Sequence, residues 1–187
     1  MRDFMAGYVR RVEWFNYRVG RVAMYGIFAM MAVLLWSSFT KTAPFMRPSL
    51  WTLETAQYLM VAYYMLGGPY SIQLESNVRM DLVYGAMSFR RKAFVDCFTV
   101  VFLIIYLGFL LYGGSNSLTY AVEFNERSSS VWRPYVWPVK TVMVVGIILM
   151  LLQAFAELFK DIERFRTGLA EPFGPGPAAG QKVAGDV

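Results

Sequence analysis

The sequence has no histidine, and its 187 residues include one cysteine, Cys97. Without imidazole it lacks the usual axial ligand of b-type haem, the commonest zinc ligand and the commonest general base. A single Cys excludes an internal disulfide and a cysteine cluster. The glycine-rich nucleotide motifs and the hydrolase nucleophile and zinc motifs are also missing. We therefore expect a protein that is not an enzyme, with no cofactor and no metal site, and the missing imidazole argues against a membrane redox subunit.

Charged residues are also scarce. They make up 17% of the chain and apolar residues 57%, whereas about a quarter of a soluble domain is charged. Four runs contain almost no charged residues, at about 22–40, 55–74, 97–122 and 135–156. In the last run Lys140 is expected to extend its ammonium toward the lipid headgroups. Helices of such length cross a hydrocarbon core of roughly 30 Å, whereas transmembrane strands are shorter and alternate in polarity. The pattern predicts an all-α integral membrane domain over residues 22–166 with four transmembrane helices.

The basic residues predict the orientation of these helices. Thirteen of the 18 Lys and Arg residues lie before the first run, between the second and third, or after the fourth. Because basic residues accumulate on the cytoplasmic side, both termini are expected in the cytoplasm, an N-in/C-in topology. The net charge of +5 does not indicate a nucleic-acid partner, because the basic residues flank apolar runs instead of covering a soluble face.

The two terminal segments differ from the spans. Residues 1–21 are amphipathic at helical spacing, and a basic amphipathic helix of this kind lies in the membrane plane; a cytoplasmic helix packed on a partner is the alternative. Residues 167–187 contain a Gly- and Pro-rich stretch that cannot bury a core, so we expect a disordered cytoplasmic tail. The N-terminal apolar positions are Met1, Phe4, Met5, Tyr8, Val12 and Phe15.

Few polar residues interrupt the runs. Glu54 opens the second run, where a carboxylate favours a helix N-terminus; the alternative is an intramembrane acid that pairs with a partner or a proton. Asn116, Gln73 and Gln153 are isolated polar groups, which usually hydrogen-bond between helices. A chain that builds a transport site alone usually has paired charges within its spans and an inverted repeat. The four runs contain neither.

Three stretches together resemble one family. They are WTLETAQYLMVAYYMLGGPY at 51–70, NVRMDLVYG at 77–85 and NERSSSVWRPYVWPVK at 125–140. In this order and spacing they resemble the small permease subunit of TRAP (tripartite ATP-independent periplasmic) transporters, the DctQ-like family. The resemblance covers roughly residues 15–165 and includes the family's Glu at position 54 and Gly at position 67. Asn77 stands where the family commonly has His, and an amide keeps hydrogen-bonding capacity there.

The resemblance implies a role and partners. Such subunits are multi-pass proteins of the bacterial inner membrane that support a large TRAP permease subunit in sodium-coupled uptake of an organic acid. A periplasmic substrate-binding protein delivers the substrate, and membrane lipids surround the complex. Candidates for the large-subunit interface or a structural corner are Glu54, Gly67, Asn77, Arg79 and Asp81. Candidates for contact with the periplasmic partner are Glu126, Arg127, Trp132, Arg133 and Tyr135.

A second function stays open at this stage. A self-sufficient small four-span transporter or channel could act as a homodimer, as small proton-coupled exporters do. That class needs an acid deep within a span, and Glu54 lies at the edge of one.

Overall fold

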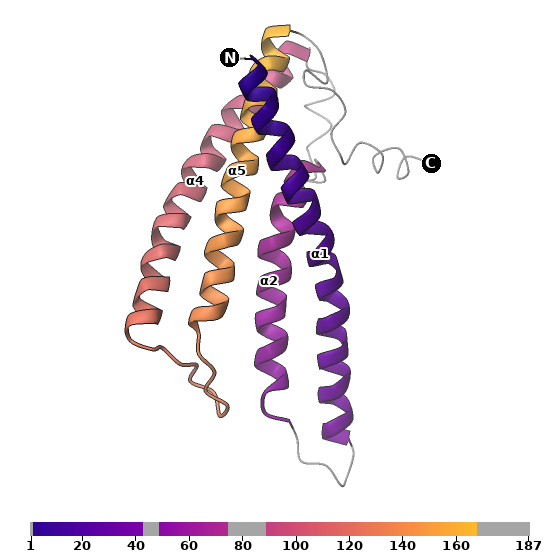
Figure 1. Ribbon diagram of the computed structural model, residues 1–187, viewed down its shortest axis with the longest axis vertical. Coiled ribbons are helices and arrows are strands. Elements are labelled where there is room, and N and C mark those ends of the chain that lie inside the picture. Colours follow the sequence, from indigo (N-terminus) through magenta and orange to yellow (C-terminus); the bar gives the residue numbers. More distant parts are fainter. Residues whose placement is uncertain (1, 43–48, 75–88, 168–187) are drawn as a thin grey trace.

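The computed structural model describes residues 2–42, 49–74 and 89–167, which are folded into long α-helices (Figure 1). Helices that follow one another in the chain run antiparallel. Helices α1 and α4 begin at one end of the molecule, and α5 ends there (Figure 1). We call this the terminal end and the opposite one the loop end. The helices are α1 (Arg2–Thr42), α2 (Thr52–Gln73), α4 (Phe89–Glu123) and α5 (Trp137–Thr167).

Three of these helices are long and apolar enough to cross a membrane, namely α1 over Phe4–Thr42, α4 over Val95–Glu123 and α5. The all-α prediction and the multi-pass membrane character are therefore confirmed. Helix α2 has 22 residues and a length of about 33 Å at 1.5 Å per residue, which suffices for a crossing. Its Thr, Gln, Glu and Tyr residues lower its hydropathy, so the second of the four predicted spans, at 55–74, stays a prediction.

Helix α1 is longer than a crossing requires. Its 41 residues extend about 62 Å, roughly twice the thickness of a hydrocarbon core. The predicted boundary at residue 21 does not coincide with a helix end, because the amphipathic segment and the first span form one continuous helix. The in-plane orientation of residues 1–21 stays a prediction, and the first half of α1 lies along the last half of α5 (Figure 1).

Helix α5 occupies the centre of the arrangement. It packs against each of the other three helices, whereas α4 packs chiefly on α5, and α2 lies against both α1 and α5. Of the most apolar stretch of α5, 39% is buried, compared with 6% in α1 and in α4. The two outer helices therefore expose most of their apolar surface.

Small residues allow the helices to approach closely. A Cβ added at Gly20 of α1 would lie 2.6 Å from Cγ of Tyr70, and one added at Gly146 of α5 would lie 2.8 Å from the carbonyl oxygen of Met65. Small residues are typical of helix contacts in lipid, where close packing replaces the hydrophobic effect between helices. Between α4 and α5 the apolar core is centred on Leu107 and Ile147.

Candidate functional site

The segment between α4 and α5, residues 124–136, forms a tight hairpin at the loop end. The Ser128 amide donates to the Pro134 carbonyl at 2.9 Å, and the Val136 amide donates to the Glu126 carbonyl at 3.1 Å. Arg127 and Tyr135 form an isolated antiparallel bridge between them. Arg133 turns the chain with a φ of 49°. These backbone bonds give the hairpin a fixed shape.

Side chains close the same hairpin. The Arg127 guanidinium donates to the Tyr135 hydroxyl at 2.5 Å and lies 4.3 Å from the centroid of the Tyr135 ring. The Lys140 ammonium pairs with Glu126 at 2.6 Å. The pair links the hairpin to the first turn of α5. We call these residues and the α2 residues that they reach the hairpin cluster: Glu54, Tyr58, Glu126, Arg127, Ser128, Tyr135 and Lys140.

The hairpin cluster is attached to α2 through Glu54. The Ser128 hydroxyl donates to Glu54 Oε1 at 3.1 Å, and the Tyr58 hydroxyl donates to the Tyr135 carbonyl at 3.4 Å. Glu54 is 7% exposed, and within the described part of the chain its Oε2 atom has no hydrogen-bond partner. Glu54 therefore positions the hairpin over the end of α2, a contact that its place in the first helical turn does not reveal.

A second polar cluster joins α1 and α5 near the terminal end, and we call it the polar seam: Glu13, Asn16, Gln153, Glu157 and Lys160. The Asn16 amide donates to Gln153 Oε1 at 2.8 Å, and the Gln153 amide donates to Glu157 Oε1 at 3.1 Å. Lys160 then pairs with Glu157 at 3.0 Å and with Glu13. The predicted role of Gln153 in hydrogen bonding between helices is confirmed.

The polar seam is buried and its charges are interdependent. Glu13 and Glu157 are 5% and 8% exposed, and the single ammonium of Lys160 lies between them. Breaking a buried ion pair by removing one partner is strongly destabilising, because a charge is left without compensation. Lys160 therefore holds the two carboxylates, and with them the first half of α1, against α5.

Comparison with protein families decides the identity. The family model for tripartite ATP-independent periplasmic transporters, DctQ component, matches residues 30–164, which is most of the chain. The chain belongs to the DctQ family. This DctQ component is thus a transporter subunit and not an enzyme. No curated protein and no solved structure matched it in the corresponding searches.

In this DctQ component the structure brings together four of the residues singled out from the sequence. Glu54, Glu126, Arg127 and Tyr135 all belong to the hairpin cluster. Two further candidates, Trp132 and Arg133, lie on the hairpin outside the cluster. The Trp132 side chain is 47% exposed, and the Arg133 amide donates to Ser130 Oγ at 3.2 Å.

The remaining candidates lie apart from the hairpin. A Cβ added at Gly67, in the second half of α2, would meet nothing within 4 Å. Packing within the chain therefore does not require glycine at this position. Asn77, Arg79 and Asp81 lie outside the described residues, as does the predicted tail from residue 168 onward.

The polar seam was not predicted. Glu13 is not one of the apolar positions predicted to form the buried stripe of residues 1–21, yet it faces α5. A signal was nevertheless present in the spacing. Glu13 and Asn16 are three residues apart, and Gln153, Glu157 and Lys160 follow at spacings of four and three, so each set shares one helix face. When two helices each carry a row of polar side chains at the same membrane boundary, the two rows are expected to face each other.

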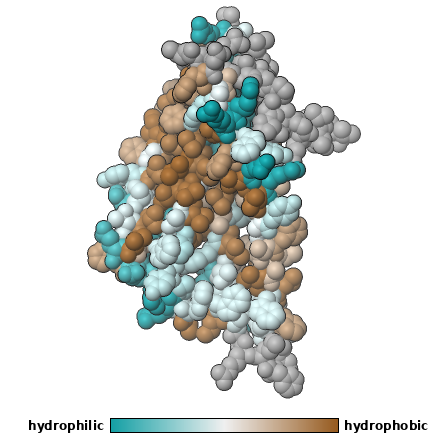
Figure 2. Space-filling model, viewed as in Figure 1, coloured by the Kyte–Doolittle hydropathy of each residue, from teal (hydrophilic) through white to brown (hydrophobic). Residues whose placement is uncertain are grey.

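The outer surfaces of α1 and α4 are apolar and aromatic. In Figure 2 apolar residues gather on the half of α4 and α5 nearer the terminal end, with paler aromatic and polar residues nearer the loop end. A surface of this kind fits lipid or the helices of another membrane protein. The most exposed large side chains of these two helices are Phe4, Val22, Tyr25, Phe28 and Leu35 on α1, and Phe98, Tyr106, Phe109 and Tyr112 on α4.

Proposed function

We propose that this DctQ component is the stationary scaffold of a TRAP transporter and that a large permease subunit, supported by it, carries out sodium-coupled uptake of an organic acid. The large subunit would contain the sodium and substrate sites. A periplasmic substrate-binding protein would deliver the substrate to the pair. Both partners are the ones that membership of the family implies.

The observation that carries the proposal is the placement of charge. The ion pair Lys140–Glu126 lies at the loop end, whereas Lys160 with Glu13 and Glu157, and Arg164 with Asp161, lie near the terminal end. In the described helices no such pair lies in the middle of a span. A chain that carries ions across a membrane needs ionisable groups there, whereas a scaffold needs apolar surface, which α1 and α4 expose.

The proposed topology has four spans with both termini in the cytoplasm of the bacterial inner membrane. Helix α2 lies along α1 and α5, so it would cross the same bilayer as they do. The terminal end would then be cytoplasmic and the hairpin cluster periplasmic. Exposed Trp36, Trp51, Trp132 and Trp137 all lie toward the loop end, where indole rings favour the headgroup level.

The two partners would meet different parts of the chain. The hairpin with Trp132, Arg133 and the Arg127–Tyr135 pair would face the periplasmic binding protein. The open surface at Gly67 would admit a closely packed helix of the large subunit, because glycine permits such an approach. Glu54 would act indirectly by holding the hairpin in place, and Asn77, Arg79 and Asp81 stay candidates for a docking corner.

Affinity purification tests the proposal. The tagged chain, solubilised in mild detergent from its native membrane, should co-purify with a much larger polytopic membrane protein. Glu54→Ala and Arg79→Ala should lower the yield of the intact complex, whereas Glu123→Ala, an exposed acid at the end of α4, should not. Recovery of the chain alone from a gentle preparation would count against a scaffold role.

A further inference from the structure

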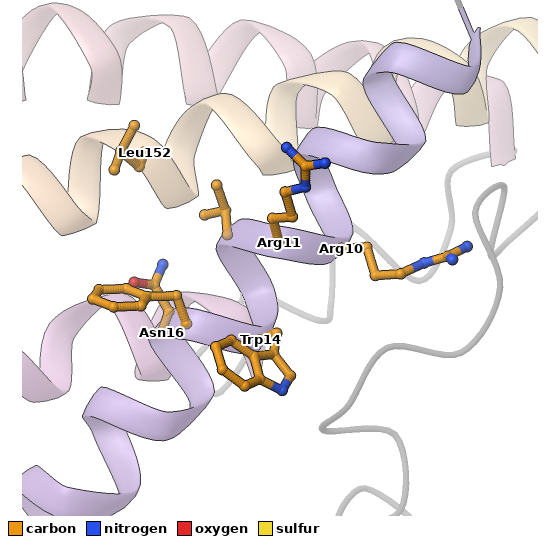
Figure 3. Close-up of a pocket in the computed structure, with 7 residues that line it drawn as sticks. Arg10, Arg11, Trp14, Asn16 and Leu152 are labelled. Carbon is orange, nitrogen blue, oxygen red and sulfur yellow. The ribbon is translucent and has the colours of Figure 1, made fainter.

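An open groove lies beside the first half of α1, between this helix and α5. It has a volume of about 570 Å³ and is lined by Arg10, Arg11, Val12, Trp14, Phe15, Asn16 and Leu152 (Figure 3). This volume lies within the range of small-molecule sites. All lining residues from α1 lie outside the 30–164 match to the family model. The groove is therefore a feature of the part of the chain that the family comparison does not describe.

The walls of the groove are almost wholly apolar, and Arg10 and Arg11 contribute chiefly the carbon atoms of their side chains to them. Arg10 and Arg11 lie toward the helix N-terminus, whereas Leu152 lies toward the middle of the molecule (Figure 3). Phe15 follows one helical turn after Arg11 along α1. Trp14 follows about one helical turn after Arg10 along α1, and the guanidinium of Arg18 lies 4.7 Å from the centroid of its ring. Arg10 and Phe15 are five positions apart on the helix, a distance of about 7.5 Å along its axis. This matches the change from headgroup to acyl chain in a phospholipid.

Two arginine side chains carry positive charge at this end. Arg10 and Arg11 form no ion pair within residues 2–42, 49–74 and 89–167. The nearby carboxylates of Glu13 and Glu157 are already held by Lys160. An occupant that complements the groove therefore carries negative charge beside the arginines and an apolar body along Phe15 and Leu152.

The level of the groove fits a lipid. Leu152 lies four residues, or about 6 Å, before the end of the fourth predicted span at residue 156. Phe15 and Trp14 are about half exposed, which is costly in water and favourable among acyl chains. Basic pockets between helices on the cytoplasmic side are typical sites for anionic lipid headgroups.

From these observations we propose that the groove between α1 and α5 binds one anionic diacyl phospholipid, whose headgroup is held by Arg10 and Arg11 and whose acyl chain lies along Phe15 and Leu152. A bound lipid fills the open side of the α1–α5 contact. The inference depends on insertion in a membrane and not on the transport role. A chain that transported solute without partners would bind the same lipid.

Native mass spectrometry of the full chain, released from detergent, tests the proposal by titration with dioleoylphosphatidylglycerol or dioleoylphosphatidylcholine. One phosphatidylglycerol should be retained at least tenfold more tightly than phosphatidylcholine. Each arginine near an anionic headgroup accounts for roughly a fivefold preference, so Arg10→Gln with Arg11→Gln should weaken phosphatidylglycerol binding about 25-fold. Both arginines are exposed, so these changes should leave the fold intact.

The matched control removes the same charge elsewhere. Arg21→Gln with Arg166→Gln takes two exposed arginines from the same half of the molecule and should change binding less than threefold. Equal losses in the two double variants would show a diffuse electrostatic effect and overturn the site.

Two further measurements identify the occupant. Inorganic phosphate at millimolar concentration should not displace the lipid, and displacement would show an anion site instead of a lipid site. The titration is then repeated on the complex purified from native membranes. Loss of the phosphatidylglycerol preference there would show that a protein partner covers the groove, which would also overturn the proposal.

Discussion

Replacing Lys160 by Met should expose how strongly the polar seam holds α1 to α5. The side chain of Lys160 is 16% exposed and pairs with two carboxylates that are themselves buried. Met keeps the length of the side chain and removes the charge, so Glu13 and Glu157 would face each other without compensation. Loss of one partner from a buried pair costs about 3–5 kcal/mol. For a chain of this size that corresponds to a fall in Tm of roughly 6–20 °C.

Thermal unfolding in detergent, followed by circular dichroism, measures this effect. The triple variant Glu13→Gln, Glu157→Gln and Lys160→Met should recover most of the lost Tm, because neutral groups of similar shape can replace a buried ion pair at little net cost. Arg166→Met, a change of the same kind at an exposed position, should shift the Tm by less than about 2 °C. If Lys160→Met unfolds at the wild-type temperature, Glu13 and Glu157 do not depend on Lys160 for compensation. The polar seam would then not hold α1 against α5.

Three further substitutions test the packing and the surface. Gly146→Ala should destabilise the chain by about 1–3 kcal/mol through overlap with Met65, whereas Gly108→Ala, with nothing within 4 Å, should stabilise its helix by up to about 1 kcal/mol; equal Tm values for the two would contradict the close α2–α5 contact. Gly67→Leu should leave the Tm of the isolated chain within about 2 °C of wild type but reduce co-purification of the large subunit, and an unchanged yield of complex would remove Gly67 from the interface. Arg133→Gly should raise stability by about 1 kcal/mol, because the φ of 49° strains any residue with a Cβ; a lower Tm in the same thermal scan would show that the Arg133 side chain contributes more than its backbone costs.

The membrane helices could be predicted because lipid imposes a simple rule on the sequence. A long run with almost no charged residues can be recognised whatever the order of its side chains. The runs at 22–40 and 97–122 lie within α1 and α4, and the run at 135–156 lies in α5 from residue 137 onward. Polar residues inside such runs have few partners apart from other helices, so the role of Gln153 was also predictable. Helix α2 was less clear because its polar and aromatic residues reduce its hydropathy.

The two clusters could not be predicted because they depend on which faces meet. Periodicity places Glu13 on a helix face but does not say that this face turns toward Lys160, 147 positions away. A carboxylate in the first turn of a helix has a sufficient local explanation, so Glu54 gave no reason to expect Ser128 as its partner. The continuity of α1 was hidden for a related reason, since the change from an amphipathic to an uncharged segment at residue 21 suggested a boundary that the helix does not have.

Reconstitution into liposomes tests most directly the claim that this chain supports transport without carrying it out. Vesicles with the chain alone, under a sodium gradient, should show no uptake of any organic acid that the complete system transports, and no proton flux above empty vesicles. Addition of the large subunit and the periplasmic binding protein should produce sodium-dependent uptake. Sustained flux of substrate or protons through the chain by itself would contradict the account.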